Sequence, residues 1–121
     1  MFKNFLLVGL GGCIGSMMRY ASWYFFGSTN FPAATLLVNI AGSFAIGIVI
    51  GLSIRDVNFS QDWKVFLATG ICGGFTTFSA FSVENLQMLQ NGKYLLSLVY
   101  ICSSIIFGIA AAWLGFKLVT N

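Results

Sequence analysis

The chain has 121 residues, of which 58% are hydrophobic and only 7% are charged, and its formal net charge is +3. A soluble domain carries about 25% charged residues, so this composition is typical of a membrane protein. The absence of histidine and the scarcity of acidic residues argue against acid–base enzymes and against most metal-ligand sets. The basic residues are scattered singly, so nothing indicates nucleic-acid binding.

Four apolar segments are each long enough to cross a bilayer core, which takes about 20 helical residues. We predict one all-α transmembrane domain over residues 1–121, with helices at about 2–26, 32–54, 63–90 and 93–119. We interpret the first segment as a retained helix, because the apolar run resumes beyond Arg19 and no small-residue cleavage site follows. Pro32 suits the first turn of the second helix, and Asn91-Gly92 suits the end of the third.

The charges between these segments give a weak orientation signal. One side would hold Lys3, Arg55, Lys64 and Lys117. The other would hold Lys93, with Arg19 an ambiguous member of that side. Lysine and arginine near helix ends normally set orientation, so such a split favours a chain that inserts both ways and pairs antiparallel. Small residues at GxxxG spacing in the first and second segments indicate close helix packing and favour oligomerisation.

The third segment is longer than one span needs, and its middle is poor helix material. Two glycines (73–74) are followed by two threonines (76–77), all with weak helix propensity. We predict half-helices over about 63–72 and 77–90 with an unwound break between them. Such breaks are tolerated only when buried in protein or lining a cavity, and in transporters they bind ions. The alternative is a simple kink at a close helix crossing.

A string of aromatic and polar residues follows the predicted break. Phe78, Phe81 and Asn85 share one helical face, with Ser82 beside it, and Thr77 lies on a neighbouring face. The positive edge of a phenyl ring can face an anion, and hydroxyl or amide donors can replace its water without a full charge. These residues therefore favour a weak, multi-site anion path, as conduction requires.

Other polar groups within the spans allow two interpretations. Asn39 in the second helix and Ser104 in the fourth could line a path or simply form interhelical hydrogen bonds. Arg19 and Glu84 are ionisable groups within or near the spans, where such groups are usually functional or paired. Arg19 could draw anions toward a pore mouth. Glu84 could be paired, protonated or near a water-filled vestibule.

Three motifs together resemble the Fluc/CrcB family of fluoride channels over nearly the whole chain. Residues 11–20 (GGCIGSMMRY), 35–47 (TLLVNIAGSFAIG) and 70–82 (GICGGFTTFSAFS) are similar to the family's first-, second- and third-helix motifs. The resemblance implies an antiparallel, dual-topology homodimer in the lipid of the cell inner membrane. Its two pores would conduct fluoride passively and reject chloride, which limits fluoride toxicity in the cytoplasm.

The resemblance also implies roles for individual residues. The residues implied to line the fluoride path are Arg19, Asn39, Thr77, Phe78, Phe81, Ser82 and Ser104. The phenylalanines would turn their ring edges to fluoride, Asn39 and Ser104 would donate hydrogen bonds, and Arg19 would lie near a vestibule entrance. Backbone carbonyls of Gly73 and Thr76 from both subunits would hold a structural sodium ion on the dimer axis.

The chain departs from the family pattern at two positions. Ser16 stands where alanine is more frequent, a small change at a packed position. Ala80 stands where many members have threonine, so no side-chain hydroxyl is available there.

Two other membrane functions compete with the channel. A small proton-coupled drug exporter would fit the size and the weak charge bias, but such exporters resemble one another in an essential acid of the first helix, which this chain lacks. A non-transporting scaffold would explain the small residues but not the polar string. An enzyme is the weakest alternative, because nucleophile, base and metal ligands are all missing as sets. A flux assay separates these functions.

Overall fold

The computed structural model describes residues 1–27 and 31–121, which are helical almost throughout and contain no strand. Four helical spans within these ranges are long and apolar enough to cross a membrane, which confirms the predicted all-α membrane class. Three spans are single helices: α1 (Phe2–Phe26), α2 (Ala33–Arg55) and α6 (Tyr94–Thr120). The remaining span consists of α3 (Gln61–Lys64), the π-helical segment η1 (Val65–Cys72), α4 (Gly73–Phe75) and α5 (Phe78–Gln90).

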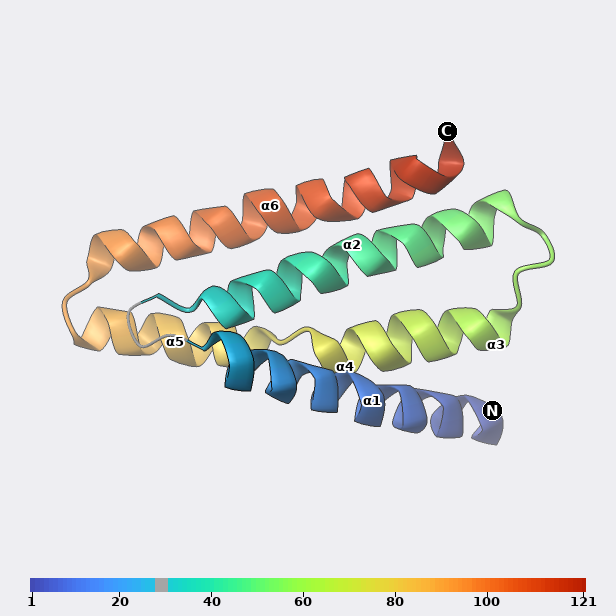
Figure 1. The fold of residues 1–121 in the computed structure, drawn as a ribbon, viewed down its shortest axis with the longest axis horizontal. Helices are drawn as coiled ribbons and strands as arrows, with labels where there is room; N and C mark the ends of the chain where they lie inside the picture. Colours follow the sequence, from blue (N-terminus) through green and yellow to red (C-terminus); the bar gives the residue numbers. More distant parts are fainter. Residues whose placement is uncertain (28–30) are drawn as a thin grey trace.

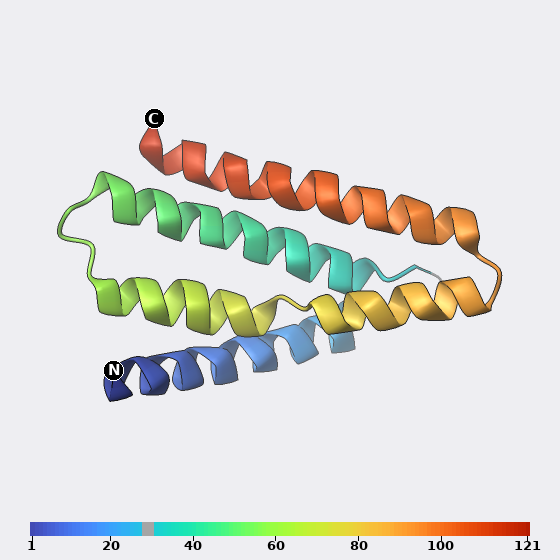
Figure 2. The same cartoon turned by 180° about the vertical axis from the view of Figure 1, so that it is seen from behind.

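The four spans lie side by side in the order α6, α2, third span and α1 (Figures 1 and 2). Spans that follow one another in the chain run in opposite directions, so the neighbours α6 and α2 run parallel, as do the third span and α1. Both chain ends lie at the same end of the molecule, as Figure 1 shows. α2 packs along α6, while α1 packs against η1 and α4. This arrangement is closer to a layer than to a closed bundle, so most large apolar side chains are exposed. Exposed apolar surface of this kind suits lipid or a second protein chain.

Glycines set the distances between neighbouring spans. A Cβ added at Gly11 would lie 2.6 Å from the Phe66 carbonyl oxygen and 2.8 Å from the Gly70 Cα. A Cβ added at Gly74 would lie 2.6 Å from the Gly12 carbonyl oxygen. Small residues allow backbones to approach this closely, which drives helix association in lipid. Gly11 and Gly15 of α1 and Gly70 and Gly74 of the third span therefore serve helix packing.

The turn between α5 and α6 is a glycine-dependent helix end. Gly92 has φ +75°, a left-handed backbone conformation that glycine adopts at a lower energetic cost than residues with a Cβ. Its N–H donates to the Leu89 carbonyl at 3.2 Å, and the Lys93 N–H donates to the Met88 carbonyl at 2.8 Å. This pair of hydrogen bonds is the Schellman motif, which satisfies the last carbonyls of α5. The predicted Asn91-Gly92 turn is confirmed here.

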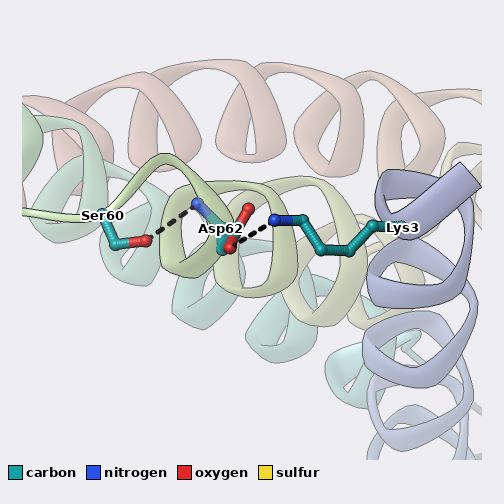
Figure 3. Close-up of polar contacts among 3 residues, drawn as sticks. All are labelled: Lys3, Ser60 and Asp62. Atoms are coloured by element: carbon teal, nitrogen blue, oxygen red, sulfur yellow. Dashed lines mark hydrogen bonds and ion pairs between the residues drawn. The ribbon is translucent and has the colours of Figure 1, made fainter. Parts of the chain in front are cut away.

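Polar contacts at the end of the molecule that holds both termini join α1 to the third span (Figure 3). Ser60 caps α3, because its Oγ accepts from the Asp62 N–H at 3.1 Å. Asp62 Oδ2 lies 3.0 Å from Lys3 Nζ, and the two side chains are 47% and 69% exposed. An ion pair this exposed contributes at most about 1 kcal/mol to the stability of the fold, so it adds little to the packing of α1 against the third span.

Gly11→Ala is expected to destabilise the fold by about 1–3 kcal/mol, because the added methyl group meets backbone atoms that cannot move independently. Gly9→Ala is the matched control on the same helix, since nothing lies within 4 Å of a Cβ added there. Thermal unfolding in detergent, followed by fluorescence or circular dichroism, measures both. Equal melting temperatures for the two variants would contradict the close α1 contact.

Candidate functional site

The third span contains two extended residues at its middle. α4 ends at Phe75, Thr76 has ψ 156° and Thr77 has φ −148° and ψ 122°, and α5 begins at Phe78. Helical structure continues through Gly73 and past it, and the extended pair comes at the threonines. Extended backbone lacks the internal hydrogen bonds of a helix, and unpaired backbone groups at membrane depth are costly. The partners of these groups therefore define the site.

Asn39 of α2 pairs with both backbone polar groups of Thr77. Its Nδ2 donates to the Thr77 carbonyl oxygen at 3.0 Å, and its Oδ1 accepts from the Thr77 N–H at 2.8 Å. The orientation of the amide is unambiguous, because a backbone N–H can only donate and a carbonyl can only accept. A single side chain on a neighbouring helix thus bonds to both the N–H and the carbonyl of Thr77.

Side chains also cap the helix ends on either side of the extended pair. Thr77 Oγ1 accepts from the Ala80 N–H at 3.1 Å, which caps the start of α5. Thr76 Oγ1 donates to the Cys72 carbonyl at 2.9 Å. Arg19 of α1 donates through Nε to the Gly74 carbonyl at 3.2 Å, which places a cation at a helix C-terminus, where it is electrostatically favoured.

Two carbonyls near the extended pair lose their ordinary donors. In a continuous α-helix the Thr77 N–H would bond to the Gly73 carbonyl, and the Ala80 N–H to the Thr76 carbonyl. Here these donors turn instead to Asn39 Oδ1 and Thr77 Oγ1. Among the described residues, no group of three or more His, Cys, Asp or Glu could hold a metal ion. A cation at this place would therefore be bound by backbone oxygens.

Two clefts meet at Thr77. The smaller, of about 360 Å³, has polar lining from Asn39, Ser43, Thr76 and Thr77. The larger, of about 680 Å³, has the same threonine at one side, together with Arg19, Glu84 and several aromatic side chains. Arg19 therefore both binds the backbone beside the extended pair and faces a cleft. The clefts bring the predicted polar residues of α1, α2 and α5 together.

The predicted phenylalanine face of α5 joins a row of aromatic rings. Phe78 and Phe81 have ring centroids 5.7 Å apart, and Phe81 lies 5.0 Å from Tyr100 of α6. Phe78 is 77% exposed, whereas Tyr100 is fully buried. Ser82 is exposed, and its hydroxyl donates to the Phe78 carbonyl of its own helix at 3.0 Å. Nothing in the sequence marks Tyr100 as a site residue, because this tyrosine lies in an ordinary apolar run.

Glu84 is held by two hydroxyl groups from two other helices. Thr35 Oγ1 of α2 donates to Oε2 at 2.8 Å, and the Tyr100 hydroxyl of α6 donates to Oε1 at 2.8 Å. Glu84 is thus hydrogen-bonded to neutral hydroxyl groups and also lines the larger cleft, and its protonation stays a prediction. The carboxyl group ties α5 to α2 and α6.

Ser104 of α6 differs from these paired groups. Its Oγ is buried and has no hydrogen-bond partner among the described residues. Buried polar atoms are almost always hydrogen-bonded, and an exception calls for an explanation such as a water molecule or an ion. Within the described residues the Ser104 hydroxyl is therefore unsatisfied.

Comparison with known proteins places this geometry in a family. Residues 6–116 match the family model described as "CrcB-like protein, Camphor Resistance (CrcB)". A relative from Leptospira interrogans serovar copenhageni, named "Fluoride-specific ion channel FluC", is 48% identical over 122 residues, which cover 98% of this chain and 96% of the relative. The protein of that name from Azobacteroides pseudotrichonymphae is 44% identical over 98% of this chain and 97% of its own length. "Fluoride-specific ion channel FluC 1" from Listeria monocytogenes is 40% identical, with 98% of each chain covered. With a family model spanning most of its length and relatives aligned nearly end to end, the chain belongs to the CrcB-like (FluC) family.

Proposed function

We propose that this protein is a fluoride-selective channel that passively exports fluoride across the cell membrane. The observation that carries the proposal is the near-full-length identity of 48% to a relative named as a fluoride-specific ion channel. The site supports it, because its polar groups lie in spans where lipid alone would not tolerate them. Hydrogen fluoride crosses membranes and dissociates inside, and the membrane potential drives the trapped anion outward. A passive path suffices, and no catalytic chemistry is needed.

The donors at the site suit a small anion that must shed its water. Asn39 Nδ2 carries two hydrogens, of which one is bonded to the Thr77 carbonyl and the second can donate to fluoride. The unpaired hydroxyl of Ser104 can also donate, and the ring edges of Phe78 and Phe81 carry partial positive charge. Neutral donors compensate dehydration without trapping the ion, as conduction requires. Thr77, Ser82 and Arg19 complete the proposed path.

We propose further that two copies pair antiparallel to enclose the paths. Phe78 is 77% exposed and Gly73 is exposed, although both lie at the middle of a span. A two-fold axis in the membrane plane would set the extended pairs of the two copies opposite each other and cover these residues. The weak charge asymmetry of the chain favours this dual topology.

A structural sodium ion between the two copies is part of this proposal. The Gly73 and Thr76 carbonyls have lost their helical donors, so each copy offers two backbone oxygens of the kind that hold sodium at discontinuous helices. Two copies would supply both pairs of oxygens to one ion. The residues present therefore fit such a cation, whose charge would offset the carbonyl ends of the two half-helices.

The purified protein in liposomes is expected to release fluoride rapidly and to retain chloride. In Phe78→Ile and Phe81→Ile the path loses a positive ring edge; a loss of about 1 kcal/mol per ring corresponds to about fivefold slower fluoride efflux. A fluoride electrode outside the liposomes measures the rate. Absence of fluoride efflux from the folded unmodified protein would reject the channel, and unchanged rates in both variants would remove the phenylalanines from the path. Proton-coupled transport of cationic dyes would instead support the drug exporter.

Asn39→Asp is expected to abolish fluoride efflux. A carboxylate cannot donate to the Thr77 carbonyl, and its fixed charge repels the anion. Asn39→Ala separates the two effects, because it removes the pairing without adding charge and should retain partial flux. Asn58→Asp in the exposed α2–α3 loop is the control for charge alone and should conduct normally. Normal efflux through folded Asn39→Asp at neutral pH would exclude Asn39 from the path.

In detergent containing sodium, light scattering is expected to give the mass of a dimer, and C-terminal reporters in cells should read on both sides of the membrane. Replacing sodium with choline should lower the melting temperature, because the facing carbonyls then lose their counter-charge. A monomeric mass in both buffers would reject the dimer, and reporters on one side only would reject dual topology. A melting temperature independent of sodium would reject the ion.

A further inference from the structure

Two side chains of α5 are buried, and one of them is polar. Within α5, which is fully described, only Asn85 and Met88 are buried, while Phe78, Val83 and Leu86 are exposed. A helix is normally oriented by an apolar stripe that faces its neighbours. Because Met88 is the only side chain of α5 that is both apolar and buried, directional polar contacts add to the information that sets the rotation of α5 about its own axis.

Asn85 provides such a contact to α6. Ser97 Oγ donates to Asn85 Oδ1 at 2.7 Å, and Asn85 Nδ2 donates to the Phe81 carbonyl at 2.8 Å. Both side chains are buried, Asn85 at 8% and Ser97 at 2% exposure. The direction of each bond is determined, because a carbonyl only accepts and the amide oxygen therefore faces the serine. The contact is short, directional and shielded from water or lipid headgroups.

This contact lies one helical turn from the rings of Phe81 and Tyr100. Phe81 and Asn85 are one turn apart on α5, and Ser97 and Tyr100 are one turn apart on α6. The Phe81 and Tyr100 ring centroids lie 5.0 Å apart with a 52° tilt, and an aromatic contact of this kind is less directional than a hydrogen bond. The Ser97–Asn85 hydrogen bond therefore restricts the rotation of the helix that carries the Phe81 ring.

We propose that Asn85 and Ser97 are positioning residues of the anion path, which set the rotation of α5 and thereby the angle of the Phe81 ring. This inference rests on the proposed fluoride channel. The angle matters because a phenyl ring is positive at its edge and negative at its face. A small rotation of α5 would turn the repulsive face toward the anion. Neither residue needs to touch fluoride.

The test separates positioning from simple helix association. Ser97→Ala alone, or Asn85→Leu alone, leaves a buried polar group unpaired and should lower the stability of the protein. The double variant Asn85→Leu/Ser97→Ala removes both partners, so its stability should return toward that of the unmodified protein. Under our proposal the double variant melts near the unmodified protein yet exports fluoride at least about fivefold more slowly, as expected for losing about 1 kcal/mol of ring-edge stabilisation. Ser97→Thr, which keeps the hydroxyl, should retain full flux.

Ser22→Ala is the control, because within the described residues the Ser22 hydroxyl bonds only to its own helix, at the Met18 carbonyl, and its loss should leave stability and flux unchanged. Fluoride and chloride efflux from liposomes and the melting temperature are measured for every variant. A double variant with unmodified stability, flux and selectivity would overturn the positioning role and leave the channel intact. Loss of stability and flux in parallel across the series, including Ser97→Thr, would also overturn it. Absence of fluoride efflux from the unmodified protein would reject the proposed function itself.

Discussion

The pairing of the Asn39 amide with the Thr77 backbone is the contact on which the rest of the site depends. Backbone that leaves the helix within a membrane span needs hydrogen-bond partners, and one amide supplies both for Thr77. The same contact draws the Thr77 N–H away from the Gly73 carbonyl, which is thereby left without its helical donor. One side chain therefore both pairs the extended backbone and frees one of the carbonyls that we propose as a sodium ligand.

The glycines of the third span serve a different purpose from the one their propensity indicates. Gly74 remains in a helical segment and lies against the backbone of Gly12, where a Cβ would clash. This close approach brings Arg19 of α1 within reach of the Gly74 carbonyl. Gly74 is thus used for packing, whereas a Cβ added at Gly73 would meet no neighbour closer than 3.9 Å. The extended residues are the threonines, whose hydroxyls bond to both helix ends.

Within the described residues, three side-chain hydrogen bonds from other helices reach α5. Glu84 receives hydroxyl hydrogens from α2 and α6, and Asn85 receives one from Ser97. In lipid there is little hydrophobic force to orient a helix, so directional hydrogen bonds carry more of that information. We infer that the orientation of the phenylalanine face depends in part on these polar groups, of which Asn85 and Ser97 line neither cleft at Thr77.

The amino-acid sequence by itself determined the four spans and the family, because apolar length and contiguous motifs are local properties of the chain. It also marked Asn39, Phe81 and Glu84 as unusual within apolar segments. Only the tertiary structure decided that Asn39 binds the Thr77 backbone and that Glu84 is held by hydroxyls. Those partners lie on other helices far along the chain, and polar periodicity on one helix does not determine which groups a second helix brings within hydrogen-bond distance.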